Sequence, residues 1–373
     1  MNAAAESLTV QKSKHRRLKL IVSDLHLGVG LQLQDGTLNP LEEFYFDQKF
    51  AEFIGHYTSG QFADCEVELI FNGDIFNFLQ IDYHGHYVSV ITESMTLNKL
   101  ERIVEGHPVF FESLKKFVSQ GHKITYIVGN HDQEILWPRV REYLNTVIGH
   151  RIQYENLVYF FDGVHVEHGH MHEAANRMNP KKFFLRKDIP EPILNLPFGS
   201  HFFVECVLRL KLRYPHVDKA RPFGKALRWM LVNEPVFFVK STFKVLGYML
   251  RSMFVSNNPR KAWGFREVFK IMMECAVFPD LTQGAAKILK DERVHTVVFG
   301  HNHVYKYKLW ADGKQYFNSG TWTDLTSLDI NSLGKITKLT YVLLEYPHES
   351  RKPLARLKEW KGYHRIEEEV AIT

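Results

Sequence analysis

The sequence predicts an α/β fold with a helical segment inserted into it. In the first half of the chain, short runs rich in Val and Ile alternate with longer helical patterns, which is typical of a sheet whose strands are joined by helices. The segment from about residue 174 to 290 is basic, aromatic-rich and helical in pattern, and strand-like runs resume after it. Hydrophobic residues make up 45% of the chain and charged residues 24%, so a packed core is expected rather than disorder.

The expected strands are short, apolar and followed by polar clusters. They cover residues 18–22, 67–71, 124–128, 164–166 and 294–299, with further runs at 304–309, 315–318 and 337–344. Helices are expected at residues 41–57, 108–120 and 134–147. In sheets of this kind ligands collect beyond the carboxyl ends of the strands, which is where the polar clusters lie.

The net charge of +5 hides an asymmetry. Residues 177–290 hold 21 Lys and Arg against 8 Asp and Glu, whereas the remainder holds 26 against 34. The basic segment is therefore expected to face something anionic, which could be nucleic acid, a membrane surface or a phosphorylated substrate.

Cysteine usage and hydropathy indicate a cytoplasmic setting. Cys65, Cys206 and Cys275 lie far apart, which argues against a disulfide framework and against a cysteine zinc site. No signal-peptide pattern precedes the first basic cluster. A membrane-spanning helix needs about 20 uncharged apolar residues. The longest candidate, residues 235–255, is interrupted by Lys240 and Lys244 as well as Arg251.

The polar clusters supply carboxylate, imidazole and amide donors without a thiolate, a mixture that suits Mn²⁺, Fe or Zn²⁺. The donors are Asp24, His26, Asp74, Asn130, His131, His168, His301 and His303. Two Asp-x-His or His-x-His pairs are spaced i,i+2, so in extended backbone both members would point to the same side. One such pair alone is a metal site in roughly one case in ten and is otherwise a polar turn. Five clusters, each after an apolar strand, are not expected by chance.

The motifs SDLHLG (23–28), NGD (72–74), VGNHD (128–132), EHGH (167–170) and FGHNH (299–303) resemble, in order, the five motif blocks of the calcineurin-like metallophosphoesterases. The resemblance implies a four-layer αββα sandwich of two mixed sheets. It implies a catalytic domain of residues 18–173 and 291–346, an inserted helical cap at 174–290, and terminal extensions at 1–17 and 347–373.

The resemblance also implies a site for two divalent metal ions, most simply Mn²⁺. Asp24, His26 and His303 would hold the first ion. Asn130, His168 and His301 would hold the second, and Asp74 would bridge them. Two cations about 3.5–4 Å apart lower the pKa of a bound solvent molecule, which then attacks phosphorus in line.

The implied catalytic residues are His131, placed beside the leaving group, and Asp132, expected to orient its ring. His170 and Arg177 are candidate substrate contacts. The alternative is that His170, like His165, belongs to the surrounding loop and has no role in binding.

The motif SDLHLG and the helical insertion are similar to the UDP-2,3-diacylglucosamine diphosphatases, which implies a pyrophosphate bond in a lipid-linked sugar nucleotide as the substrate. Two residues depart from that pattern, because the branch usually has Arg at the position of His131 and Asp at the position of His170. A phosphodiesterase or nuclease of the same superfamily is the alternative, and its binding would depend on salt. A non-catalytic membrane-binding scaffold is an alternative of another class.

An anionic membrane surface is the expected partner of the cap. Lys240, Lys244 and Arg251 are spaced by four and seven, so they fall on one side of a helix that is otherwise largely apolar. The competing interpretation is that this helix packs on the catalytic domain with its basic side chains in water.

Overall fold

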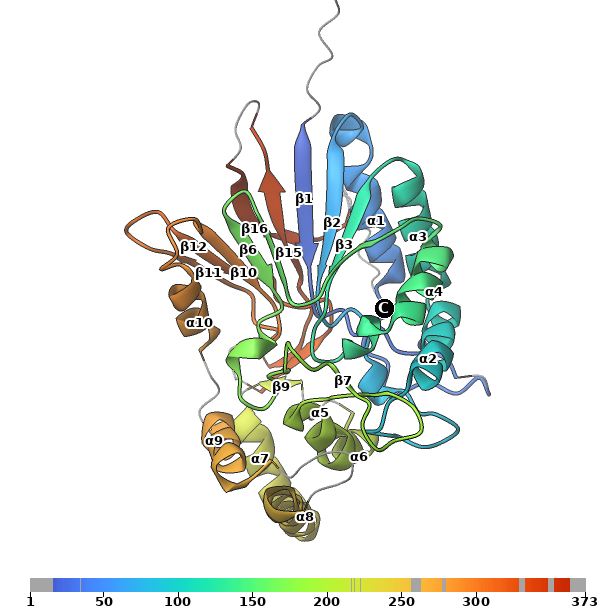
Figure 1. Cartoon of the computed structure of the whole chain (residues 1–373), viewed down its shortest axis with the longest axis vertical. Coiled ribbons are helices and arrows are strands. Elements are labelled where there is room, and N and C mark those ends of the chain that lie inside the picture. The colour runs from blue at the N-terminus through green and yellow to red at the C-terminus, as the bar shows by residue number, and fades with distance from the viewer. Residues whose placement is uncertain are drawn as a thin grey trace, which may run out of the picture.

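The computed structural model describes residues 16–33, 35–215, 217, 219–221, 223–255, 263–276, 280–328, 333–347 and 352–362. Most of the predicted amino-terminal extension and the end of the carboxy-terminal one, residues 1–15 and 363–373, lie outside the described residues. Two sheets face each other at the centre of the molecule (Figure 1).

The first sheet has six strands in the order β16-β15-β1-β2-β3-β4. They are β1 (Arg17–Val22), β2 (Glu66–Asn72), β3 (Lys123–Ile127), β4 (Gln153–Glu155), β15 (Leu339–Glu345) and β16 (Leu354–Trp360). The strands β1 to β4 run parallel, whereas β15 is antiparallel to both β1 and β16. The parallel strands therefore end at one edge of the sheet.

The second sheet has five strands in the order β11-β12-β10-β6-β5. They are β5 (Val158–Phe161), β6 (Val164–Glu167), β10 (Thr296–Phe299), β11 (Lys306–Leu309) and β12 (Gln315–Asn318). The central strand β10 is parallel to both β6 and β12.

The two sheets enclose one apolar layer and carry helices on their outer faces. Ile21, Ile70 and Ile127 of the first sheet belong to the same buried cluster as Val166 and Val298 of the second. Four helices cover the outer face of the first sheet, namely α1 (Asp47–Tyr57), α2 (Glu93–Gly106), α3 (Pro108–Ser119) and α4 (Pro138–Ile148). The outer face of the second sheet is covered by α10 (Leu281–Ile288). This order of layers confirms the predicted αββα sandwich.

Between β6 and β10 the chain forms a mainly helical segment at one end of the molecule (Figure 1). Its strands are β7 (Phe184–Leu185), β8 (Ile193–Leu194) and β9 (Ala220–Arg221). Its helices are α5 (Phe198–Phe202), a π-helical turn (Phe203–Val207), α6 (Leu208–Arg213), α7 (Phe223–Asn233), α8 (Pro235–Phe254) and α9 (Phe265–Ala276). The strand β9 pairs with β13 (Leu325–Ser327), which also pairs with β14 (Gly334–Ile336).

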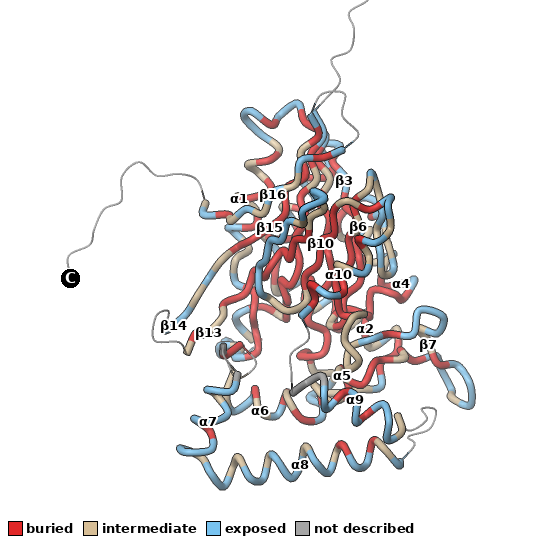
Figure 2. The backbone as a smooth tube through the Cα atoms, turned by 90° about the vertical axis from the view of Figure 1, so that its left-hand side faces the viewer, coloured by how far each residue is buried: buried red, intermediate tan, exposed pale blue. Residues whose placement is uncertain are grey.

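Figure 2 shows α8 running along the outer end of this segment with most of its length exposed. Within the described part of the chain, no helix is both long enough and apolar enough to cross a membrane.

Helix α1 begins at Asp47, six residues after the predicted start. The carboxylate of Glu42 accepts hydrogen bonds from the backbone N–H groups of Gly28, Gly30 and Phe44. A side chain that binds the backbone in this way competes with helix formation, so the segment before Asp47 is a loop.

Candidate metal centre

The predicted donors lie just beyond the strands that carry them. Asp24 follows β1, Asp74 follows β2 and Asn130 follows β3. His168 follows β6, and His301 with His303 follows β10 of the facing sheet. The two sheets therefore bring residues from five strands to one edge of the sandwich.

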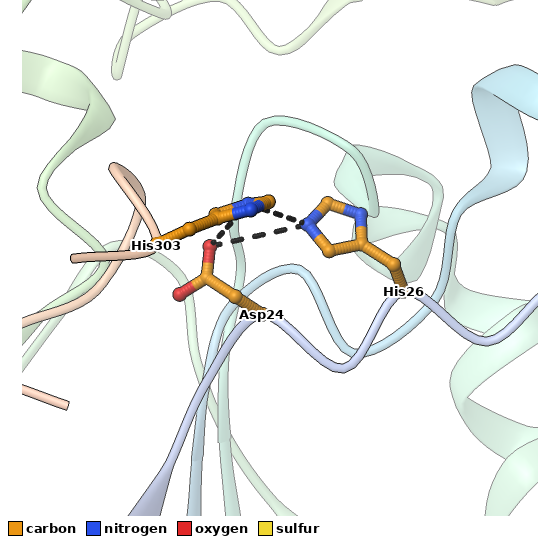
Figure 3. A group of neighbouring side chains, drawn as sticks. All are labelled: Asp24, His26 and His303. Atoms are coloured by element: carbon orange, nitrogen blue, oxygen red, sulfur yellow. Dashed lines mark hydrogen bonds and ion pairs between the residues drawn. The ribbon is translucent and has the colours of Figure 1, made fainter. Parts of the chain in front are cut away.

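The first group consists of Asp24, His26 and His303, whose donor atoms lie within 4.8 Å of one another (Figure 3). The Nε2 atoms of His26 and His303 are 3.0 Å apart, and Nε2 of His303 is 3.3 Å from Oδ1 of Asp24. Two imidazole nitrogens and a carboxylate oxygen that converge in this way fit the ligand set of a divalent cation.

The second group consists of Asp74, His168 and His301. Nε2 of His168 lies 3.1 Å from Oδ2 of Asp74, while its Nδ1 donates a hydrogen bond of 2.8 Å to the carbonyl of Asn72. That bond fixes the ring with Nε2 facing the centre. The same Oδ2 of Asp74 is 3.9 Å from Nε2 of His26, so Asp74 stands between the two groups.

Asn130 supplies an oxygen that suits a cation. Its Oδ1 is buried and has no hydrogen-bond partner among the described residues. Because buried polar atoms are almost always satisfied, this orphaned amide oxygen needs an explanation, and the next residue, His131, donates its backbone N–H to Asp74. A bound metal ion provides one, and the residues present therefore fit the predicted pair of ions.

The backbone at the centre is strained. Among the described residues, eight non-glycine residues have a positive φ, and five of them are predicted metal ligands. The five are Asp24 (55°), His26 (55°), Asp74 (54°), His301 (76°) and His303 (63°). Side chains other than glycine adopt this left-handed region at a cost, and such residues cluster at functional sites.

The left-handed turns correct one argument made from the sequence. We expected the i,i+2 pairs to converge because extended backbone places alternate side chains on one side. Asp24 and His26 do approach each other, with Oδ1 and Nε2 4.0 Å apart, whereas His301 and His303 join different donor groups. All four lie in left-handed turns beyond the strands rather than in extended backbone.

Two glycines leave room for the carboxylates. A Cβ atom on Gly129 would lie 2.1 Å from Oδ1 of Asp74, and one on Gly300 would lie 2.5 Å from Oδ2 of Asp24. Glycine is therefore required at both positions, by a ligand from the neighbouring strand at Gly129 and by a ligand from the facing sheet at Gly300.

Electrostatics favour the metal-binding form of His26 and Asp74 but not that of His168. Burial, together with the nearby His131 and His303 rings, lowers the pKa of His26 to about 3, so its ring is neutral. Burial opposes ionisation of Asp74, but the neighbouring histidines, above all His168, hold its pKa well below the usual value. Burial likewise disfavours the charged ring of His168, yet Asp74 and Asp24 raise its pKa to about 10. Metal binding would therefore release a proton from His168.

His131 lies beside the first group, with its ring centroid 4.9 Å from that of His26. Its Nδ1 donates to Oδ1 of Asn77 at 3.0 Å, and the ring of Phe203 packs against it with centroids 5.2 Å apart. Phe203 belongs to the inserted segment, so that segment reaches the centre.

The expected role of Asp132 is wrong. Its carboxylate accepts hydrogen bonds from the backbone N–H groups of Ile75 and Gly129 and from the hydroxyl of Tyr126, whereas Asn77 orients the His131 ring. Asp132 follows His131 in a turn that directs its side chain back into the protein, where it joins two ligand-bearing loops. Burial and the nearby Asp74 raise the pKa of Asp132 to about 7.

The two candidate substrate contacts lie in different surroundings. His170 is buried next to His168, and its Nε2 donates to the sulfur of Met178 at 3.1 Å. Arg177 is exposed, and its Nε donates to the carbonyl of Met171. Nε2 of His165 donates to Oε2 of Glu167 at 2.9 Å.

Two carboxylates beside the ligands were not predicted. Oε2 of Glu173 accepts a hydrogen bond of 2.8 Å from Nε2 of His301, and Oε2 of Glu43 lies 3.8 Å from Nδ1 of His26. Glu173 closely follows the EHGH motif, but nothing in the sequence distinguishes Glu43 from its neighbour Glu42.

Solved structures similar to this chain include a dimetal phosphatase and a Vps29 protein. No protein-family model matches the sequence, and no curated protein sequence matches it. A dimetal phosphatase from Danio rerio aligns over 91% of this chain and 98% of its own, with 10% identity and a TM-score of 0.33. Vps29 from Entamoeba histolytica, complexed with zinc, aligns over 92% and 99%, with 10% identity and a TM-score of 0.26. The fold assignment follows from the sheet order and the layers described above.

Proposed function

We propose that this chain is a dinuclear-metal hydrolase of phosphoesters or pyrophosphates, of the calcineurin-like metallophosphoesterase kind. The observation that carries the proposal is the pair of donor groups, each built from residues of both sheets, with Asp74 of the second group close to His26 of the first. The orphaned oxygen of Asn130 supports it. The oxygen and nitrogen donors, without a thiolate, favour Mn²⁺, with Fe and Zn²⁺ as alternatives.

Two bound cations would activate a solvent molecule and draw charge from the phosphoryl oxygens. His131 would act on the leaving group. The hydrogen bond from its Nδ1 to Asn77 leaves Nε2 as the atom that can hold or deliver a proton. The ring of Phe203 packs against the His131 ring in a T-shaped contact, with an interplanar angle of 76°.

For the substrate, we propose a lipid-linked or nucleotide-sugar pyrophosphate such as UDP-2,3-diacylglucosamine. The contact of Phe203 with His131 supports a role of the apolar inserted segment in binding the substrate. A nuclease is the second candidate, because the same segment carries the excess of basic residues.

A substrate panel with Mn²⁺ tests both candidates. It contains a UDP-linked acylated sugar, the same sugar nucleotide without acyl chains, nitrophenyl monoester and diester dyes, and single-stranded DNA. The control is Asp74→Asn, which should lose both ions and all activity.

Preferential hydrolysis of the acylated sugar nucleotide supports the proposal, whereas preferential cleavage of DNA supports the nuclease. Full activity on the acyl-free compound refutes the lipid part. A wild-type protein that retains at most trace metal after Mn²⁺ reconstitution, together with unchanged activity of Asp74→Asn, refutes the metal-dependent mechanism.

We propose further that α8 rests on an anionic membrane. Six apolar side chains of this helix are between 44% and 72% exposed, namely Val236, Val239, Phe243, Leu246, Leu250 and Phe254. At about 100° per residue they fall within an arc of about 80°. Lys240, Lys244 and Arg251 are exposed and fall directly beside this arc. Figure 2 shows this helix at the outer end of the molecule.

The opposite side of α8 is already occupied by protein. Met249, Val245 and Tyr248 pack in a small cluster with Phe198 and Val268 of the neighbouring helices. The helix thus has one face for the protein and a second apolar face beside a basic edge, which is the pattern of an interfacial helix.

Vesicle sedimentation tests the membrane proposal. Each Lys near an anionic surface contributes about 1 kcal/mol, so replacing Lys240 and Lys244 with Gln should weaken binding to phosphatidylglycerol vesicles roughly 30-fold. Phe243→Ser with Phe254→Ser should weaken binding to anionic vesicles by at least about tenfold. The matched control is Phe160→Ser, which removes a phenylalanine that is 47% exposed on β5, outside the inserted segment. Equal partitioning onto neutral and anionic vesicles, or none onto either, refutes the proposal.

A further inference from the structure

Two lysines of the inserted segment are buried beside the metal centre. Lys211, in α6, has no exposed surface, and Lys219 is 6% exposed. Lysine is almost never buried to this extent unless its charge is paired. Both ammonium groups face the same carboxylate oxygen, because Nζ of Lys211 lies 2.5 Å and Nζ of Lys219 lies 3.5 Å from Oε1 of Glu43.

The other oxygen of Glu43 faces the centre. Oε2 is 3.8 Å from Nδ1 of His26 and accepts a hydrogen bond of 3.3 Å from Nδ2 of Asn77. The side-chain oxygen Oδ1 of Asn77 in turn accepts the hydrogen bond from Nδ1 of His131. Glu43 therefore links the lysines of the inserted segment to His26 directly and to His131 through Asn77.

A carboxylate in the position of Glu43 is common around metal-binding histidines. A histidine that binds a metal through one nitrogen usually presents its other N–H to a carboxylate, which fixes the ring and strengthens the ligand. In His26, Nε2 faces the donor group, whereas Nδ1 is buried without a hydrogen-bond partner among the described residues. Oε2 of Glu43 lies 3.8 Å from this Nδ1, just beyond hydrogen-bond distance, and is the carboxylate placed to accept from it. A buried carboxylate is costly unless its charge is compensated, and Lys211 and Lys219 supply that compensation.

We infer that Glu43 is a positioning residue for His26 and, through Asn77, for His131, and that Lys211 and Lys219 hold Glu43 in place. The metal affinity of the centre then depends on how the inserted segment is docked. The inference rests on the metal centre of the proposed function and is independent of the substrate.

Titration calorimetry of metal-free protein with Mn²⁺ tests the inference. Glu43→Gln should weaken Mn²⁺ binding about 10- to 100-fold, the effect found when the partner of a ligating histidine is removed. Lys211→Met should weaken it similarly, and Lys211→Arg should restore most of the affinity because it keeps the charge. The double variant Glu43→Gln/Lys211→Met should be no weaker than Glu43→Gln alone, since both changes act through one contact.

The matched control is Arg213→Met. Arg213 lies two residues after Lys211 on the same helix, but it pairs with Glu234 at 2.9 Å. This variant removes a cation from α6 without touching Glu43, so its Mn²⁺ affinity should equal that of the wild type. Melting temperatures of the metal-free proteins identify any variant that is merely unfolded. Lys219→Met is a second variant that removes a cation from Glu43.

A catalytic readout separates positioning from general stability. At saturating Mn²⁺, Glu43→Gln should still slow hydrolysis of a substrate with an alkoxide leaving group more than that of a nitrophenyl ester. The reason is that the nitrophenolate needs little help from His131.

The outcomes distinguish the inference from the proposed function. Wild-type affinity in folded Lys211→Met and Lys219→Met, or additive losses in the double variant, overturn the inference alone. A wild-type protein that binds no Mn²⁺ overturns the proposed metal centre and, with it, this role of Glu43.

Discussion

His107 should make the stability of this protein fall as the pH rises from neutral to alkaline values. Its ring is 1% exposed and lies between two carboxylates, with Nδ1 3.0 Å from Asp47 and Nε2 3.6 Å from Glu42. Burial opposes the charged ring, but Asp47 and Glu42 raise the pKa of His107 to about 9 from the ordinary value of 6.5.

The sign and size of the effect follow from this shift. Because the folded state holds the proton more tightly than the unfolded state, the stabilisation is complete below about pH 6.5 and is lost as the pH passes through 9. A difference of about 2.5 pKa units corresponds to about 3.5 kcal/mol at about 1.4 kcal/mol per unit. The free energy of unfolding of the wild type should therefore fall by about that amount, relative to a variant without this charge.

Urea unfolding of the wild type and of His107→Gln between pH 6 and pH 9.5 measures the effect. Glutamine keeps a donor for Asp47 but carries no charge, so comparison with the variant removes the contribution of all other titrating groups. His150→Gln, an exposed histidine, is the control and should follow the wild type. A constant difference in unfolding free energy between the wild type and His107→Gln across this range would refute the reasoning.

Three further substitutions test the centre and its supports. His131→Ala should keep the metal content but lower the rate about 10²–10⁴-fold, with a smaller loss on nitrophenyl esters; loss of metal instead would contradict its assignment to the leaving group. Gly129→Ala should displace Asp74 and weaken Mn²⁺ binding, because the new Cβ would lie 2.1 Å from Oδ1 of that carboxylate; calorimetry with unchanged affinity would show that the loop adapts. Tyr126→Phe removes a buried hydrogen bond of 2.6 Å to Asp132 and should cost about 1–3 kcal/mol in urea unfolding, and a neutral result would show that Asp132 is satisfied without it.

The strands that carry the donors were predictable because each combines an apolar run with a polar turn. The predicted run at 67–71 lies within β2 (Glu66–Asn72), and the predicted helix at 108–120 corresponds to α3 (Pro108–Ser119), which begins at a proline as expected. Strand β16 was missed because it lies in a charged stretch assigned to the terminal extension. Its alternation of apolar and charged residues in LARLKEW is the signal that could have revealed it.

The ligands could be predicted from sequence more fully than the residues that support them. A ligand must be a carboxylate, imidazole or amide at a strand end, which restricts the choice to a few positions. A supporting residue needs only to reach the ligand through space. Glu43 and Asn77 act on residues 17 and 54 positions away, so no local pattern marks them. The domain boundaries, the substrate and the membrane contact stay predictions.

The left-handed turns at the centre have a consequence for anyone who wishes to transplant it. Aspartate and histidine are among the side chains that enter this backbone region most readily, and they are also metal donors, so one choice of residue meets two demands. A designer who copied the donors onto ideal straight strands would reproduce the chemistry but aim the side chains wrongly. A scaffold for this centre has to be selected for its turns first, and only afterwards for the residues that occupy them.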